Sequence, residues 1–310
     1  MNKSNLLVTS FLLIIALIVI PLVAVFYDQP LSELQLLATK NLVFGMIIVS
    51  LLCFLLGELT KNYSQTDKLW SIMPLFYVAY TAIKGGWNDR LILMTVLVAV
   101  WSIRLTYNFS RRGGYSLKFW EGEEDYRWTE LRKEKFLQSK WSFTLFNLFF
   151  ICLYQQALIL AFTLPGILAI QDAPNPIGIF DIVLAAVFLA FVLLETIADQ
   201  QQWNFQSEKH RRKNAGEPLT EEQQSGFISS GLWSKVRHPN YASEQSIWIV
   251  FYLFSVVATG RWINWSMVGC VLLVLLFQGS ADFSENITAG KYPDYKDYQK
   301  RVSKFLPKFW

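Results

Sequence analysis

The chain has 310 residues, of which 53% are hydrophobic and 16% aromatic, while 17% are charged. A typical soluble domain carries about 25% charged residues, so this composition argues against water as the main solvent. The formal net charge of +4 at pH 7 is an average over segments that differ strongly in charge.

Apolar runs of roughly membrane-spanning length, about 20 helical residues, follow one another along the chain. They lie at 6–26, 35–59, 68–84, 90–109, 141–164, 178–198, 239–259 and 262–280, the third and the eighth being the shortest. The first run is too long for a signal-peptide core, so we expect a membrane helix there.

These runs are apolar on every face, as in FLLIIALIVIPLVAVF, which disfavours the two-residue alternation of a membrane β-barrel. We predict an all-α integral membrane protein, a bundle of about 7–8 transmembrane helices. The tail at 291–307 is expected to add an amphipathic segment on the cytoplasmic surface. Cys53, Cys152 and Cys270 stand far apart inside apolar runs and are interpreted as core residues.

Lys and Arg are concentrated in the segments 110–140, 199–238 and 291–308, whereas the loop 165–177 contains neither. Short loops rich in Lys and Arg stay in the cytoplasm, so both termini are predicted to be cytoplasmic. Lys84, Arg90 and Arg261 are exceptions to this distribution. The aromatic residues of EGEEDYRWTELR (121–132) indicate an ordered loop that folds back on the bundle.

Polar residues form stripes on three helices, because positions three or four apart share a face. Each stripe points toward the cytoplasmic leaflet. The stripes are Trp101, Arg104 and Asn108; Glu195 and Asp199; and Asn240, Glu244 and Trp248. One interpretation places these groups at the headgroup level, where charges cost little. The other is a polar chamber that admits a soluble anionic cofactor from the cytosol.

Known nucleotide motifs are absent from the sequence. It contains neither G-x-G-x-x-G nor G-x-x-x-x-G-K-[ST], so a nucleotide would have to bind inside the helical bundle. His210 and His238 are the only histidines, and there is no G-x-S-x-G elbow that would indicate a serine hydrolase. No metal site is predicted.

Five ordered blocks resemble a known family. They are TDKLWSIMP (66–74), WSIRLTYNFSRR (101–112), EEDYRWTELR (123–132), ETIADQQQWNF (195–205), and GLWSKVRHPNYASEQSIW (231–248) followed by KYPDYKDYQKRVSKFLP (291–307). From about residue 40 onward the chain looks like the steroid 5-alpha-reductase-like membrane proteins, in the bacterial branch called domain of unknown function 1295. The N-terminal helix, within 1–34, lies outside the resemblance.

The resemblance implies a single membrane domain over 1–310 whose half 178–310 binds NADPH at the cytosolic side. In characterised relatives the cofactor reduces a carbon–carbon double bond conjugated to a carbonyl. Asn240 and Glu244 match the cofactor-holding Asn and Glu of the family. Other matches are Trp248, Asp199, Tyr292, and Arg111 or Arg112.

Further candidates come from the residues themselves. Arg104 and Glu195 belong to the polar stripes, and Arg237, His238 and Tyr241 belong to the turn that opens the seventh helix, so all five are candidate cofactor-binding residues. Their donors and acceptors suit a nicotinamide carboxamide and phosphates.

The sequence departs from the family at two points. Ser243 stands where relatives usually have Gly before the Glu. Relatives also polarise the substrate carbonyl with a Glu and a Tyr, for which Glu58 and Tyr107 are the nearest candidates.

We therefore expect an NADPH-dependent reductase of a lipid or steroid-like enone in a bacterial inner membrane. Its expected partners are the bilayer and a lipid-soluble small molecule, with no nucleic acid. The alternatives are an S-adenosylmethionine-dependent methyltransferase of the isoprenylcysteine methyltransferase type and a non-catalytic lipid-binding protein. The sequence does not indicate an oligomeric state.

Overall fold

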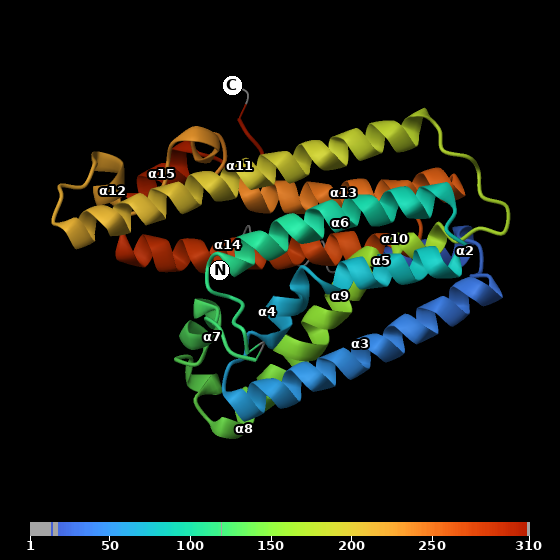
Figure 1. Ribbon diagram of the computed structural model, residues 1–310, viewed down its shortest axis with the longest axis horizontal. Coiled ribbons are helices and arrows are strands. Elements are labelled where there is room, and N and C mark those ends of the chain that lie inside the picture. Colours follow the sequence, from blue (N-terminus) through green and yellow to red (C-terminus); the bar gives the residue numbers. More distant parts are fainter. Residues whose placement is uncertain (1–13, 15–17, 119, 309–310) are drawn as a thin grey trace. The chain divides into compact units, whose positions relative to one another are not determined.

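The computed structural model describes residue 14 and residues 18–118 and 120–308, and in these residues it contains helices and no strand (Figure 1). The helices are α2 (Ile20–Tyr27), α3 (Glu33–Thr60), α4 (Gln65–Trp70), α5 (Met73–Lys84), α6 (Asp89–Ser110), α7 (Tyr126–Leu131), η2 (Lys135–Leu137), α8 (Lys140–Phe146), η3 (Asn147–Tyr154), α9 (Gln155–Thr163), α10 (Pro165–Leu168), α11 (Ile179–Ala215), α12 (Glu221–Ser225), η4 (Gly231–Ser234), α13 (Pro239–Thr259), α14 (Met267–Lys291) and α15 (Tyr295–Arg301).

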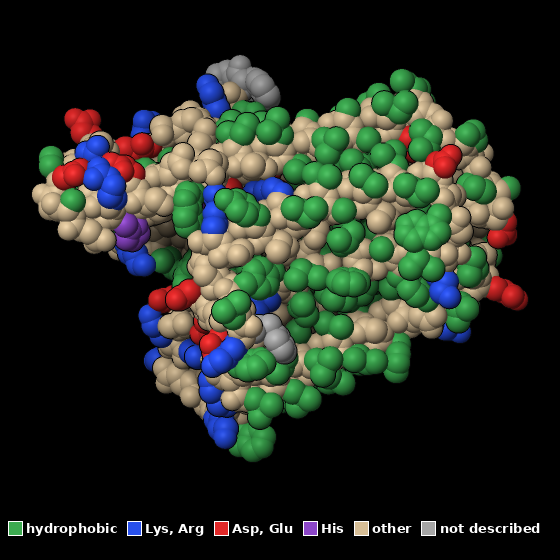
Figure 2. All heavy atoms as spheres, in the orientation of Figure 1, with side chains coloured by type: hydrophobic (Ala, Val, Ile, Leu, Met, Phe, Trp, Pro, Cys, Tyr) green, Lys and Arg blue, Asp and Glu red, His purple; other side chains and the backbone are tan. Residues whose placement is uncertain are grey.

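Six helices of the described residues are long and apolar enough to cross a bilayer. They are α3, α6, the continuous run Lys140–Leu168, α11, α13 and α14. Large hydrophobic side chains are exposed along them, and Figure 2 shows such side chains over much of the visible surface. The prediction of an all-α integral membrane protein is confirmed.

Two of the predicted spans, the first and the third, are not among the six long helices of the described residues. Most of the run 6–26 lies outside the described residues, which show α2 at its end. The run 68–84 is divided by a turn at Ser71 and Ile72, and α5 then begins with Pro74 in its first turn. A helix of 12 residues rises about 18 Å, too little to span the bilayer alone. Hydropathy alone did not indicate this break.

The chain folds into two compact units, which we describe separately. The N-terminal unit contains Ile14–Ala185 and Phe251–Val271, and the C-terminal unit contains Ala186–Val250 and Leu272–Trp310. The assignment of 178–310 as the cofactor-binding half of one membrane domain stays a prediction.

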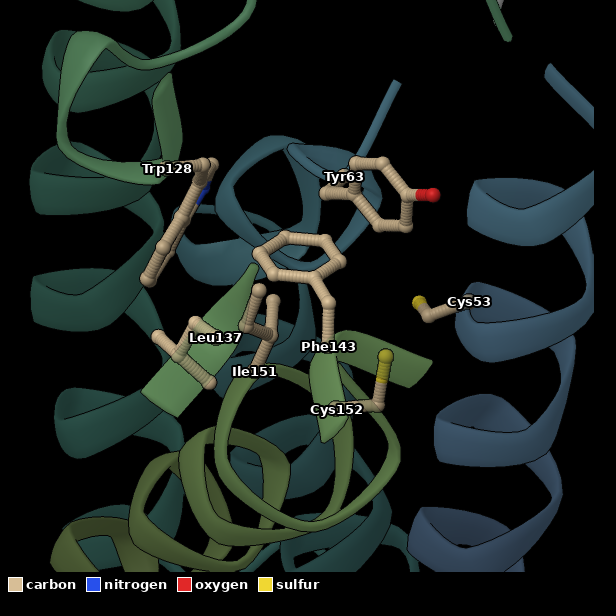
Figure 3. Packing of buried hydrophobic residues seen from close by; sticks show 7 residues of the cluster. All are labelled: Cys53, Tyr63, Trp128, Leu137, Phe143, Ile151 and Cys152. Atoms are coloured by element: carbon tan, nitrogen blue, oxygen red, sulfur yellow. The ribbon is translucent and has the colours of Figure 1, made fainter. Parts of the chain in front are cut away.

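The core of the N-terminal unit lies where α3 and the run from α8 to α9 meet (Figure 3). The ring of Phe143 packs edge-on against Tyr63, with centroids 4.8 Å apart and planes at 86°. Cys53 and Cys152 are buried in this cluster, and Cys270 is buried in a second one. The interpretation of the cysteines as core residues is confirmed.

At one end of this unit, the loop after α6 folds onto the turn after α3, as predicted for residues 121–132. Asn62 donates to the carbonyl of Gly122 at 2.8 Å. Trp128 of α7 is buried and donates its indole N–H to Asp67 Oδ2 at 2.7 Å. Lys and Arg side chains gather over this region, near α7 and α8 (Figures 1 and 2).

At the other end of the unit, hydrogen bonds link the turns between the helices. Gln35 at the start of α3 donates to the carbonyl of Ile170 at 2.7 Å, and Asn88 before α6 donates to the carbonyl of Ala169 at 3.1 Å. The guanidinium of Arg90 forms a buried bidentate pair with Asp181, at 2.7 and 3.0 Å. These contacts fix the two ends of the helical bundle within the unit.

Candidate functional site

The first turns of α13, in the C-terminal unit, carry three predicted site residues on one face. The helix begins at Pro239, whose missing N–H costs nothing in a first turn. Asn240, Glu244 and Trp248 follow at intervals of four residues. The side chains of Glu244 and Trp248 are only 4% and 0% exposed, and the indole N–H of Trp248 donates to Glu244 Oε1 at 3.0 Å.

A second helix brings a carboxylate to this face. Asp199 of α11 is 3% exposed, and its Oδ1 accepts a hydrogen bond from Asn240 Nδ2 at 3.0 Å. The Asn240 Oδ1 accepts from the backbone N–H of Tyr241 at 2.9 Å, which orients the amide. Glu195 lies one turn before Asp199 and is also buried. Two of the predicted stripes, on α11 and α13, therefore meet.

The turn before α13 is held by a buried charge cluster around Glu285 of α14. Its carboxylate accepts from Arg237 Nε at 2.7 Å and lies 2.8 Å from His238 Nε2. Gln299 donates to the same carboxylate at 2.7 Å. His238 also stacks on Tyr241, with ring centroids 5.3 Å apart. The cluster fixes the direction in which α13 leaves the turn.

The C-terminal tail is tied to the same turn through its backbone. The N–H groups of Arg237 and His238 donate to the carbonyls of Ser303 and Lys304, at 2.8 and 3.1 Å. Arg237 Nη1 donates to the carbonyls of Gln299 and Val302. With its guanidinium committed in this way, Arg237 is a structural tie, and the geometry does not support its predicted role as a phosphate ligand.

Tyr292, another predicted site residue, packs against the connection between α12 and η4. Lys209 of α11 lies over its ring, 5.2 Å from the centroid, and donates to the carbonyl of Gly226 at 3.0 Å. Gly226 has φ +93°, and a Cβ there would meet the Tyr292 ring at 2.0 Å. This position therefore requires glycine.

The segment that leads into the turn is anchored on α11. The backbone N–H of Leu232 donates to Gln201 Oε1 at 3.0 Å, and the indole N–H of Trp233 donates to the carbonyl of Ala198 at 3.1 Å. Tyr298 of α15 donates its hydroxyl to the carbonyl of Trp233. Burial raises the pKa of Tyr298, so its phenol is protonated and serves as a donor. The start of α13 is thus positioned from α11, α14 and the tail.

The remaining predicted cofactor-binding residues belong to the N-terminal unit. Arg111 donates to Asn108 Oδ1 at 2.9 Å and lies over the ring of Tyr107, 5.8 Å from its centroid. Arg104 is half-buried on α6, and Arg112 is exposed just after it. A shared site of these arginines with Asn240 stays a prediction.

The two predicted catalytic residues also lie in the N-terminal unit. Glu58, near the end of α3, accepts from Asn147 Nδ2 at 3.0 Å and lines a cavity of about 420 Å³. Tyr63 lines the same cavity, and its pKa is raised by burial and then by the negative charge of Glu58. Tyr107 is 66% exposed and does not line this cavity. Within the cavity, Tyr63 is thus the phenol that accompanies Glu58.

The polar groups at the start of α13 include both hydrogen-bond donors and acceptors. An amide nitrogen carries two N–H donors, and Asn240 uses one of them for Asp199. A buried carboxylate follows one turn later on the same face, in Glu244. This set offers both a donor and an acceptor, which is what a carboxamide needs. Arg211 and Arg212 pair with Glu208 on α11, so they are not obvious phosphate ligands.

Some of the residues that build the site were not predicted from the sequence. Glu285 lies beyond 280, where the predicted eighth helix ended, and the observed α14 continues to Lys291. An acid in such a helix was a usable signal, because carboxylates in membrane helices usually have a partner. Lys209, Gln201 and Tyr298 act through backbone carbonyls or amides, and no sequence pattern indicates such contacts.

Comparisons with known proteins add a family. The family model described as "Protein of unknown function (DUF1295)" matches residues 53–302. An uncharacterized protein of Schizosaccharomyces pombe is 34% identical over an alignment 308 residues long, gaps included, and the alignment covers 91% of this chain and 88% of the relative. No solved structure matches the chain. Because the family match takes in both Glu58 and the whole of α13, and most of the chain with them, the protein belongs to the DUF1295 family.

Proposed function

We propose that this protein is an integral-membrane, NADPH-dependent reductase of a carbon–carbon double bond conjugated to a carbonyl in a lipid or steroid-like substrate. The observation that carries the proposal is the contact between Asp199 and Asn240, with the buried Glu244 one turn further along α13. A buried ionisable group in a membrane helix is costly and is by default a candidate for a functional site.

In this proposal, Asn240 and Glu244 hold the carboxamide of the nicotinamide, and Asp199 keeps the Asn240 amide in position. NADPH, when bound, supplies the hydride. The indole of Trp248 fixes the Glu244 carboxylate, so that it does not have to be reoriented when the cofactor binds. Tyr292, Tyr241 and His238 border the cofactor, with Glu195 adding to its polar surroundings. Arg104, Arg111 and Arg112 stay candidate cofactor-binding residues from the resemblance and the polar stripes.

Glu58 and Tyr107 are the groups proposed for the substrate carbonyl from the resemblance of the five sequence blocks to the steroid 5-alpha-reductase-like proteins. Tyr63, which lines the cavity with Glu58, is the alternative phenol. Glu58 is held in place by Asn147. A protonated acid or a phenol close to the carbonyl would stabilise the negative charge that develops on its oxygen.

The cytoplasmic orientation of both termini and a bacterial inner membrane belong to the same proposal. The basic residues around α7 and α8 support the orientation. One relative comes from Schizosaccharomyces pombe, which is not a bacterium. The proposed bacterial inner membrane therefore applies to this chain and not to the whole family.

The proposal is tested by ligand-dependent protection of the purified protein against thermal unfolding in detergent. We expect NADPH to stabilise the wild type by about 2.7 kcal/mol at one hundred times its Kd. Asn240→Ala should weaken NADPH binding about tenfold or more, since one hydrogen bond to the ligand is lost. Asn204→Ala, on the exposed side of α11, is the matched control and should bind normally.

Two results would reject the proposal. One is the absence of protection by either NADPH or NADH far above micromolar concentrations. The other is protection by S-adenosylmethionine in their place, which would favour the methyltransferase class.

A further inference from the structure

The cavity that Glu58 lines also carries basic and apolar side chains to which the reductase proposal gives no role. It has a volume of about 420 Å³ and lies in the N-terminal unit. Its apolar wall is formed by Tyr63, Leu137 and Phe143, and three cationic side chains, those of Lys61, Arg132 and Lys140, line it as well. A cavity lined by both apolar and cationic side chains suits an amphiphile with a negatively charged group.

Arg132 is the best-fixed cation of this cavity. Its guanidinium lies over the rings of Tyr63 and Phe143, 4.4 and 4.7 Å from their centroids, and donates to Glu124 Oε1 at 2.8 Å. Its Nε is buried and has no hydrogen-bond partner among the described residues. Because this nitrogen is closed off from water, a ligand in the cavity can reach only the exposed part of the guanidinium, whose side chain is 36% exposed.

The charges around Arg132 favour an anionic acceptor. Lys61 is exposed and lies 3.5 Å from Glu58, the one acidic residue that lines the cavity. Lys140 is exposed and forms no ion pair within the described part of the chain. Arg132 and Lys61 are thus each close to one carboxylate, Glu124 and Glu58, and Lys140 adds a positive charge that would attract a phosphate.

The cavity also lies at the level where two membrane spans end. The α3 span ends at Thr60, just before Lys61, and the span Lys140–Leu168 begins at the cavity. Next to Lys140, Trp141 is 79% exposed at the start of its span. Exposed tryptophans at span ends belong to the aromatic belt at the headgroup level of the bilayer. A ligand in this cavity is thus at the depth of lipid phosphates.

We infer that this cavity binds the phosphate of an anionic phospholipid. The exposed part of the Arg132 guanidinium and the ammonium groups of Lys61 and Lys140 attract the phosphate. The apolar wall of Tyr63, Leu137 and Phe143 contacts the upper part of an acyl chain. This binding does not depend on the proposed reductase activity.

The test is thermal protection and native mass spectrometry of the purified protein with phosphatidylglycerol, phosphatidylcholine or inorganic phosphate. We expect phosphatidylglycerol to bind and protect better than the other two. Replacing Lys61 and Lys140 together by Gln should weaken binding by about fivefold for each lysine, the effect of one basic residue near an anionic lipid surface.

The matched control replaces Lys118 and Lys133 by Gln, because these exposed lysines pair with Glu121 and Glu130 outside the cavity. It should bind phosphatidylglycerol like the wild type. Equal protection by phosphatidylcholine, or an equal loss in the two double variants, would overturn the inference. Protection by inorganic phosphate as strong as that by phosphatidylglycerol would overturn it too, in favour of a free anion. The wild-type comparison of lipids stands even if a variant fails to fold.

Discussion

Glu285 is the residue on which the start of α13 depends most. It is the shared partner of Arg237, His238 and Gln299, and it is almost fully buried. Forming α14 does not require a buried carboxylate with three partners. We therefore infer that Glu285 stabilises the turn that precedes Asn240. The hydrogen bonds of Glu285 thus link the block 231–248 to α14 and α15, and the sequence of that block does not indicate these contacts.

We predict that Glu285→Gln destabilises the protein by about 3 kcal/mol, because it leaves the buried Arg237 guanidinium without its counter-charge. Equilibrium unfolding in detergent measures this change. Asp297→Asn, which breaks an exposed pair with Lys300, is the control and should cost less than about 1 kcal/mol. Equal stability of Glu285→Gln and wild type would show that the cluster is not the support that we describe.

Asp125 gives a second residue-scale prediction, concerning pH. Burial alone would raise the pKa of Asp125, but the charge and hydrogen bonds of Arg127 outweigh burial and lower it. A lowered folded-state pKa means stability that is present above the ordinary value of about 3.9 and is lost as the pH falls through the folded value. The pKa of the neighbouring Asp67 is raised by burial, so its contribution has the opposite sign.

We therefore expect amide-exchange protection of α7 in the wild type to fall below about pH 4. Asp125→Asn should be less protected at neutral pH and should lack most of this acid-induced loss. Asn is as good a helix N-cap as Asp, so the variant removes the charge and keeps the cap that Asp125 provides. Parallel acid profiles of variant and wild type would contradict the assignment.

At the scale of elements, the sequence predicted most helices but not their breaks and extensions. The apolar runs located α3, α6 and α13 closely, and they located the start of α11, which continues beyond the predicted end at 198 to Ala215. Hydropathy missed the division between α4 and α5, where Pro74 starts a new helix, and the polar continuation of α14 to Lys291. The π-helical η3 also has no signature in hydropathy, because it depends on how the run Lys140–Leu168 packs against α3.

Paired charges explain two exceptions to the distribution of basic residues. Arg90 is buried against Asp181, and Arg261 pairs with Asp28. Each pair removes a net positive charge from its end of the unit. A count of Lys and Arg in the sequence cannot detect such compensation, since the partners are 91 and 233 residues apart.

Close packing of α14 on α9 gives the element-scale prediction. A Cβ at Gly269 would lie 2.1 Å from the carbonyl oxygen of Ala161, so Gly269→Ala must push the two helix backbones apart. We expect a loss of about 1–3 kcal/mol in unfolding free energy. Gly279→Ala, in the same helix with nothing within 4 Å, should be neutral or stabilising by up to about 1 kcal/mol. Equal effects of the two variants would refute the close approach.

At the scale of the whole molecule, charge predicts the orientation in the bilayer. The connection between α6 and α8 is rich in Lys and Arg, whereas residues 165–177, between α10 and α11, contain none. Because basic loops remain in the cytoplasm, the first segment should be inside and the second outside.

We predict that a membrane-impermeant maleimide labels Asp172→Cys in intact cells and labels Lys118→Cys only after permeabilisation. Both positions are exposed, and the native Cys53, Cys152 and Cys270 are buried and so contribute little background. The reverse labelling pattern would place the basic loops outside and would contradict a cytosolic cofactor site.

The candidate site could be predicted in part because its residues follow helical spacing. Asp199 and Asn240 meet as the stripes on α11 and α13 indicated, whereas Arg237 turned out to bind Glu285 and the tail. Spacing shows which residues share a face of one helix. It does not show which of several buried acids will pair with a given arginine. It also does not identify the residues that contact the substrate, so Glu58 and Tyr107 are proposed from the resemblance alone.

The central claim is that the face of α13 bearing Asn240 and Glu244 serves hydride transfer from NADPH. The most direct measurement is to incubate the purified protein with a membrane-lipid extract and NADPH deuterated at its transferable position, and to search for deuterated lipid by mass spectrometry. We predict one deuterium in a lipid that has gained two hydrogen atoms, lost in Asn240→Ala and kept in Asn204→Ala. Absence of labelled lipid with wild-type protein, while a labelled methyl group from S-adenosylmethionine enters a lipid, would contradict the account.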